Sequence, residues 1–307
     1  MQEGSRKAIV AAFFANLGIA IAKFVGFAAT GAASMLAEAV HSVADSTNQG
    51  LLLLGGRQAR RPATAEHPFG YGRERYFWSF VVALVIFTLG SLFALFEGVE
   101  KLRHPHELES IAWAVGILLF SIALESFSLR TAVKESAHAK GAQSWWQFIR
   151  HSKNPELPVV LLEDIGAMLG LFLALVGVVM AELTGNARFD ALGSVGIGLL
   201  LGVIAVTLVI EMKSLLIGEA ASPAVRNRIH GTMEGVDSVR RVIHMRTQHL
   251  GPDELLVCAK LEFDPDLEFH AIAEVIEGVE ASVREAVPSA RVIYVEPDFT
   301  RPERGSS

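Results

Sequence analysis

The sequence predicts a mainly α-helical membrane protein in which six transmembrane helices precede a small αββαβ domain in the cytoplasm. Three observations support this fold class. Hydrophobic residues make up 51% of the 307 residues and charged residues only 20%, which is less charge than a soluble domain of this length usually carries. The apolar residues gather in long stretches, each able to cross a bilayer core as a helix of roughly 20 residues. After Ile217 the composition becomes mixed, as in a soluble domain.

The apolar stretches define the predicted membrane part, residues 1–218. They cover residues 8–29, 35–54, 77–99, 111–129, 159–183 and 192–216. Lys and Arg gather before the first stretch, between the second and third, and between the fourth and fifth, which predicts that both termini are cytoplasmic. The alternative, a soluble all-helical protein, is disfavoured by this charge asymmetry. Because no cleavable signal or targeting extension is evident, we expect an integral protein of a bacterial inner (plasma) membrane.

Residues 219–298 are expected to form the αββαβ domain, and residues 299–307 a disordered tail. Ser222 followed by Pro223 indicates the start of a helix. Two strands, 239–251 and 254–263, are joined by a Gly-Pro-Asp turn, and an amphipathic helix and a last strand follow within 268–297. This order suggests a small sheet with helices on one face, as in ferredoxin-like or metallochaperone-like domains.

Between the fourth and fifth predicted spans lies a polar stretch, residues 135–158, that contains Trp145 and Trp146. We interpret it as a cytoplasmic loop whose aromatic pair sits at the membrane interface. A plain linker is the alternative.

Charge and cysteine content exclude several classes of function. The formal net charge of −6 argues against nucleic acid as a partner. The single cysteine, Cys258, excludes an intrachain disulfide and a zinc site built from several cysteines. No phosphate-binding loop is present, so pumping driven by ATP is not indicated.

The second predicted span carries Glu38, His41 and Asp45, although an ionisable group at bilayer depth is expensive unless it is compensated. His41 and Asp45 are four residues apart, so on a helix both side chains reach the same face and could hold one cation. Glu38 lies about one turn earlier, on roughly the same face. The alternative is a hydrogen-bonded His–Asp pair that only holds helices together.

The fifth predicted span carries a second acidic pair, Glu163 and Asp164. Adjacent helical residues diverge by about 100°, so at most one of the two points squarely at a common centre. If Asp164 faces the second span, it can surround one ion together with His41 and Asp45. Such nitrogen and oxygen ligands suit Zn²⁺, and they also suit Fe²⁺, Co²⁺ or Mn²⁺. The alternative is that these carboxylates reach cytoplasmic water, because Pro158 is only about two turns away.

Further polar residues inside the spans are weaker candidates. Asn48 and Gln49 continue the second span and could line an ion pathway with Glu38. Glu125 and Ser126 in the fourth span are expected to be interhelical hydrogen-bond partners or interface residues rather than ligands.

Taken together, these residues resemble the cation diffusion facilitator family over nearly the whole chain. The resemblance rests on the motif "HSVAD" in the second span, the loop "HPFGYGRERYF" before the third, the polar fifth span and the αββαβ tail. The form of the fifth span, "LLEDIGAMLGL", and the long connection before it are similar to the zinc transporter 9-like branch.

The resemblance implies a function and an assembly. Residues 1–218 would be the transport domain and residues 219–298 a dimerisation domain of a homodimer. The protein would not be an enzyme but a secondary active transporter, which exports divalent transition metals from the cytoplasm in exchange for protons by alternating access. No cofactor is implied, since Zn²⁺ or a related ion is the substrate and H⁺ the coupling ion.

The resemblance also assigns the ligands. His41 and Asp45 match the family's pair in the second span, and Asp164 matches the second position of the pair in the fifth span. The first position of that pair is Val160, where the family normally has histidine, so the fourth ligand could be Glu163, Gln49 or water.

Two other family sites look incomplete. In the loop before the third span His67 remains, but Tyr71 stands where another ligand would follow. In the tail His249 and His270 are candidates, but Lys260 and Val295 occupy ligand positions. We therefore expect the tail to dimerise by packing rather than through bridging metal.

Three other kinds of protein are alternatives. A metal-sensing membrane protein should bind metal strongly in the tail, where ligands are scarce. A channel should pass metal without a pH gradient. A membrane-embedded enzyme would need a nucleophile or a second metal, and the sequence offers no such constellation.

Overall fold

The structure is a computed structural model. It describes residues 10, 13–14, 16–21, 24–25, 28, 33–104 and 111–299; at 33–42 and 85–87 it describes only the backbone. The chain divides into two compact units. The first comprises residues 1–60 and 74–213, and the second residues 61–73 and 214–307.

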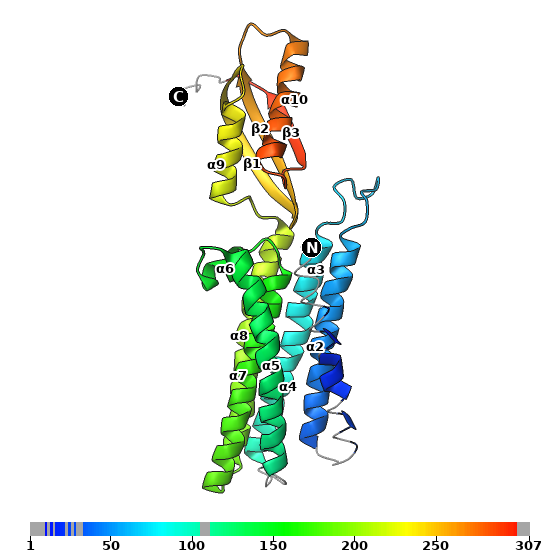
Figure 1. Ribbon diagram of the computed structural model, residues 1–307, viewed down its shortest axis with the longest axis vertical. Coiled ribbons are helices and arrows are strands. Elements are labelled where there is room, and N and C mark those ends of the chain that lie inside the picture. The colour runs from blue at the N-terminus through cyan, green and yellow to red at the C-terminus, as the bar shows by residue number, and fades with distance from the viewer. Residues whose placement is uncertain are drawn as a thin grey trace, which may run out of the picture. The chain divides into compact units, whose positions relative to one another are not determined.

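The first unit is helical (Figure 1). Its elements are α2 (Ala33–Gln58), α3 (Glu74–Val81), the π-helical segment η1 (Val82–Phe87), α4 (Thr88–Arg103), α5 (Ile111–Lys140), α6 (Trp145–His151), α7 (Glu156–Thr184) and α8 (Arg188–Ile217). Half of the most apolar 18-residue stretch of α7 is buried, against 11% of the corresponding stretch of α5. Helix α7 is therefore the more central helix of this pair.

Among the described residues, four helices are long and apolar enough to cross a membrane: Glu74–Arg103, which joins α3, η1 and α4, and the helices α5, α7 and α8. They confirm the third to sixth predicted spans. The second predicted span is helical, as α2, but it is not among these four. In the first predicted span every described residue is helical, and the others lie outside the described residues. The total of six spans therefore stays a prediction.

The predicted loop at 135–158 contains more helix than expected. Helix α5 continues to Lys140, and α6 begins after Ser144. Ser144 and Gln147 form a capping box, in which each side chain accepts a hydrogen bond from the other residue's backbone N–H. Hydropathy alone missed these turns, because a helix outside the apolar core does not need an apolar sequence.

Close packing of α7 on α8 depends on small residues. A Cβ added at Gly166 would lie 2.8 Å from Ile204 Cδ1, and one added at Gly177 would lie 3.0 Å from the Phe189 carbonyl oxygen. Gly166 and Gly177 therefore let α7 approach α8 closely.

The second unit is a three-stranded sheet with two helices, in the predicted order αββαβ. Its elements are α9 (Pro223–Glu234), β1 (Val239–Gly251), β2 (Glu254–Phe263), α10 (Phe269–Ala286) and β3 (Val292–Pro297). The central strand β2 pairs antiparallel with β1 and parallel with β3. The hydroxyl of Ser222 caps α9 by accepting a hydrogen bond from the Val225 N–H, and Pro223 opens the first turn, as predicted.

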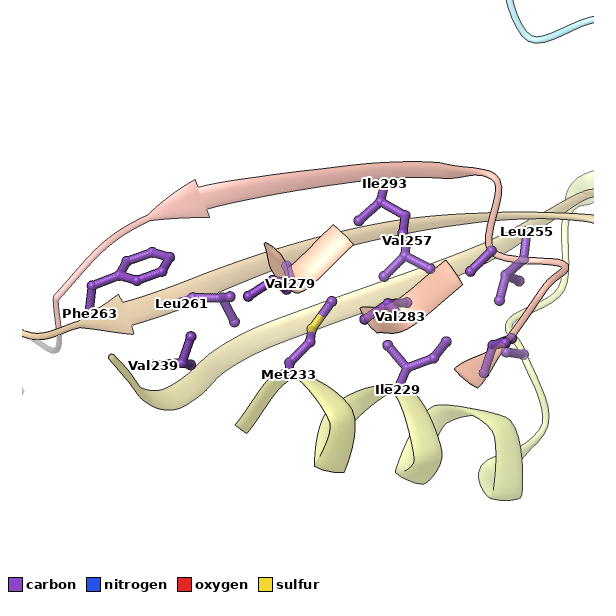
Figure 2. Close-up of a cluster of buried hydrophobic side chains, with 14 residues drawn as sticks. Ile229, Met233, Val239, Leu255, Val257, Leu261, Phe263, Val279, Val283 and Ile293 are labelled. Carbon is purple, nitrogen blue, oxygen red and sulfur yellow. The ribbon is translucent and has the colours of Figure 1, made fainter. Parts of the chain in front are cut away.

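An apolar core fills the space between the sheet and the two helices (Figure 2). The alternate residues of β2 from Leu255 to Phe263 are buried in it, which confirms the predicted period of two. Helix α9 contributes Ile229 and Met233, and α10 contributes Val279 and Val283.

Residues 61–73, which connect α2 to α3, belong to the second unit because they pack on the β1–β2 hairpin. A Cβ added at Gly72 would lie 2.9 Å from the Leu250 carbonyl oxygen, and one added at Gly251 would lie 2.9 Å from the Gly72 Cα. Two backbones meet here with no room for a side chain. Within the loop, the rings of His67 and Tyr71 stack with their centroids 4.6 Å apart.

Candidate metal centre

Helices α2 and α7 share a buried polar network. The side-chain amides of Asn48 and Gln49 both donate to Glu163 Oε1, at 3.3 and 3.4 Å. The Asn16 amide donates to Gln49 Oε1 at 3.4 Å. All four side chains are buried. Asn48 and Gln49, predicted to line a pathway, therefore hold the carboxylate of Glu163.

Asp164, one residue further along α7, is also buried, with 3% of its surface exposed. Its Oδ2 accepts a hydrogen bond of 3.0 Å from the Ser128 hydroxyl of α5. The two neighbouring carboxylates of α7 thus bond to different helices, Glu163 to α2 and Asp164 to α5. This is the divergence of about 100° that adjacent helical positions impose.

Asp45 and Glu125 bring two more carboxylates to the same region. Both interact electrostatically with Glu163 and with Asp164. Asp45 and Glu125 are half-buried. The structure therefore gathers carboxylates from α2, α5 and α7 around one part of the helical unit.

The remaining candidates of α2 are described only in part. Glu38 and His41 lie on the helix, but their side chains fall outside the described residues. Among the side chains that the structure does describe, no three of His, Cys, Asp or Glu are placed to hold a metal ion together. Val160, where the resemblance implies a departure from the family's ligand pair, is buried and apolar.

Sequence reasoning placed Glu125 among interhelical partners and did not single out Ser128. One signal was available: the two residues are three apart, so they share a face of α5. The sequence alone does not say which helix that face contacts. In the structure α5 packs along α7 (Figure 1).

A second buried polar cluster ties α3 to the first turn of α7. The Arg75 guanidinium donates to both carboxylate oxygens of Glu156, at 2.5 and 2.7 Å, and to Asn154 Oδ1 at 3.1 Å. Arg75 and Glu156 are 4% and 1% exposed. Glu156 lies seven residues before Glu163, about 10 Å along the helix. This pair holds α3 and α7 together next to the carboxylate cluster.

The candidates of the second unit are not brought together. His249 is buried on β1, where it is in register with Leu255. His270 is exposed in the first turn of α10, where its Nδ1 lies 3.6 Å from the Glu268 carboxylate. Because α10 follows the other end of β2, the two histidines lie at opposite ends of the hairpin.

The side chain of Lys260 on β2 is itself positively charged, and it pairs with two carboxylates of this unit. Its ammonium group forms ion pairs with Glu296 at 2.8 Å and with Asp298 at 3.2 Å, and these bonds raise the pKa of Lys260.

Two models of known protein families match the chain. The cation efflux transmembrane domain matches residues 9–217, and the cytoplasmic domain of cation efflux proteins matches residues 221–298. The chain belongs to the cation efflux family. This membership confirms the resemblance to the cation diffusion facilitators, and with it a helical transmembrane part followed by a cytoplasmic domain with a small sheet.

Two curated relatives come from an animal and a plant. The chain is 34% identical over 265 residues to the proton-coupled zinc antiporter SLC30A9, mitochondrial, of Mus musculus, which covers 85% of this chain and 47% of the relative. It is 29% identical to metal tolerance protein C4 of Arabidopsis thaliana, over 85% of this chain and 57% of the relative. The chain thus spans about half the length of the curated relatives that it matches.

A solved structure of the MamM C-terminal domain is 28% identical, covers 25% of this chain and 96% of its own, and has a TM-score of 0.24.

Proposed function

We propose that this protein exports divalent transition-metal cations, with Zn²⁺ as the main substrate, from the cytoplasm in exchange for protons. It would act as a homodimer with six spans and both termini in the cytoplasm, in a bacterial inner membrane. Membership of the cation efflux family and the printed function of the zinc antiporter relative support this proposal.

The observation that carries the proposal is the gathering of Asp45, Glu163 and Asp164 inside helices of a membrane protein. Buried carboxylates repel one another and are costly at bilayer depth, so a function must retain them. A divalent cation relieves this repulsion directly. His41, Asp45 and Asp164 are the proposed ligands; the fourth donor is Glu163, Gln49 or water.

Proton coupling would follow from competition for the same groups. A metal ion binds to deprotonated ligands, so its arrival displaces protons, and protons arriving from the far side expel it. His41 suits this exchange, because the unperturbed pKa of imidazole is about 6.5. Rocking of one helix group against the rest would expose the site to each side in turn. Each proton that enters down the potential contributes about 2.3 kcal/mol per 100 mV.

Transport by the purified full chain in proteoliposomes tests the proposal. We expect Asp45→Ala and Asp164→Ala each to abolish metal-dependent proton flux while the dimer persists. Thr47→Ala on α2 and Glu182→Ala on α7 are matched controls, because both side chains are exposed, and they should transport normally. Transport at the wild-type rate by Asp45→Ala or Asp164→Ala would remove that residue from the site.

The same vesicles identify the transported metal and test whether its transport is coupled to protons. Uptake of Zn²⁺, Fe²⁺, Co²⁺ and Mn²⁺ is compared with and without a pH difference. We expect Zn²⁺ to move fastest and only with the gradient. Metal flux that is independent of the gradient would indicate a channel and contradict antiport.

A further inference from the structure

The hydroxyl of Ser128 forms its hydrogen bond with another helix rather than within its own. Hydroxyls inside helices commonly bond to the carbonyl one turn earlier. Ser126 and Thr131 on the same helix do so, with Ile122 and Phe127 as acceptors. Ser128 instead donates across to the buried carboxylate of Asp164 on α7. A hydrogen bond between two helices in a low-dielectric interior holds both side chains in place, so this contact orients the Asp164 carboxyl group.

Glu125 lies on the same face of α5, three residues before Ser128. It is half-buried and interacts electrostatically with both Glu163 and Asp164. Apolar packing orients this face, because Leu118 and Ile122 of α5 lie in one cluster with Leu171 of α7. Glu125 and Ser128 continue the same face of α5 towards the carboxylates of α7.

The position of Glu125 along the bundle follows from the chain direction. Helices α5 and α7 are consecutive long helices joined through α6, and they run antiparallel (Figure 1). Glu125 precedes Ser128 on α5, so it is level with the turn that follows Asp164 on α7. It therefore lies on the side of Asp164 that is remote from Glu156 and the α6 connection.

We propose that α5 is a third wall of the cation site. Ser128 is a positioning residue that aims the Asp164 carboxylate, and Glu125 is the next oxygen donor that a divalent cation meets beyond Asp164. The inference rests on the proposed function and adds to it a third helix, beyond α2 and α7, which supply the ligands proposed above.

The two residues have separable effects on kinetics. Loss of the Ser128 hydroxyl frees Asp164 to rotate, which weakens metal binding, so Ser128→Ala should raise the KM for Zn²⁺ about tenfold or more. Ser128→Thr keeps a hydroxyl and should restore most of the affinity. Glu125→Gln removes a later ligand, so it should lower kcat with little change in KM.

Matched controls separate these effects from general damage to α5. Ser126→Ala removes an exposed hydroxyl that bonds within its own helix, and Glu182→Gln removes an exposed carboxylate from α7; both should behave as wild type. A rise in KM for Ser126→Ala equal to that for Ser128→Ala would overturn the positioning role.

Equilibrium binding of Co²⁺ to the purified full chain gives a readout independent of transport. The visible absorption of bound Co²⁺ reports its coordination, and we expect Ser128→Ala to weaken binding and alter the spectrum, with rescue by Ser128→Thr. Equal Co²⁺ affinity and spectrum in wild type and Ser128→Ala would overturn the Ser128 assignment. Wild-type kcat and KM in Glu125→Gln would overturn the Glu125 assignment. Failure of the wild type to transport any metal would instead contradict the proposed function.

Discussion

The two units of the molecule bury different kinds of residue. In the second unit the core is apolar, built from residues such as Met233, Leu261 and Val283. In the helical unit the buried residues include the amides and carboxylates around Glu163 and the pair Arg75–Glu156. Burial of apolar surface stabilises a fold directly, whereas buried charges stabilise it only while every partner is present. The helical unit therefore depends on matched polar partners, whereas the second unit depends on apolar burial.

The largest expected effect tests this dependence on partners. Glu156→Ala leaves the Arg75 guanidinium buried without its carboxylate, so we expect a loss of about 3–5 kcal/mol in the free energy of unfolding. Unfolding is measured on the purified chain by tryptophan fluorescence, because all four tryptophans lie in the helical unit. The double variant Arg75→Met with Glu156→Met removes both charges and should lose much less. Equal losses in the single and double variants would mean that the charges are not coupled.

The next largest effect is expected in the apolar core of the second unit. Leu261→Ala opens a cavity among fully buried side chains and should cost about 2–5 kcal/mol in the stability of the second unit. Hydrogen exchange of β1 and β2 should accelerate, while the tryptophan transition of the helical unit stays in place. A shift of the tryptophan transition as large as the change in exchange would show that the two units unfold together.

The smallest effect concerns the connecting loop of the second unit. Gly72→Ala puts a methyl group 2.9 Å from the Leu250 carbonyl oxygen, and the overpacking should cost about 1–3 kcal/mol. Hydrogen exchange at the β1–β2 turn is the measurement. Gly231→Ala on α9 is the control, because no atom lies within 4 Å of its new Cβ, and it should leave exchange at the turn unchanged. Unchanged exchange in Gly72→Ala would mean that the loop contact is not tight.

Local sequence rules predicted the second unit well, because its signals are short-range. The cap at Ser222 and the alternation from Leu255 to Phe263 follow from neighbouring residues, and both were confirmed. The site was harder to predict. The sequence identified Asp45, Glu163 and Asp164 as ionisable groups at bilayer depth, but not the hydrogen bonds that separate Glu163 from Asp164. The roles of Ser128 and Arg75 were missed, because their partners are 36 and 81 residues away in the chain.

By itself the sequence determined the apolar helices, the αββαβ order of the second unit, the family and the presence of acidic residues within the apolar stretches. Hydropathy, periodicity and motif are properties of contiguous residues, so they can be read without a fold. Only the tertiary structure decided that Glu163 faces the amides of α2, that Asp164 faces Ser128 of α5, and that Arg75 closes on Glu156. Each of these pairings depends on the rotation of one helix against another, and that rotation is set by packing along the whole helix.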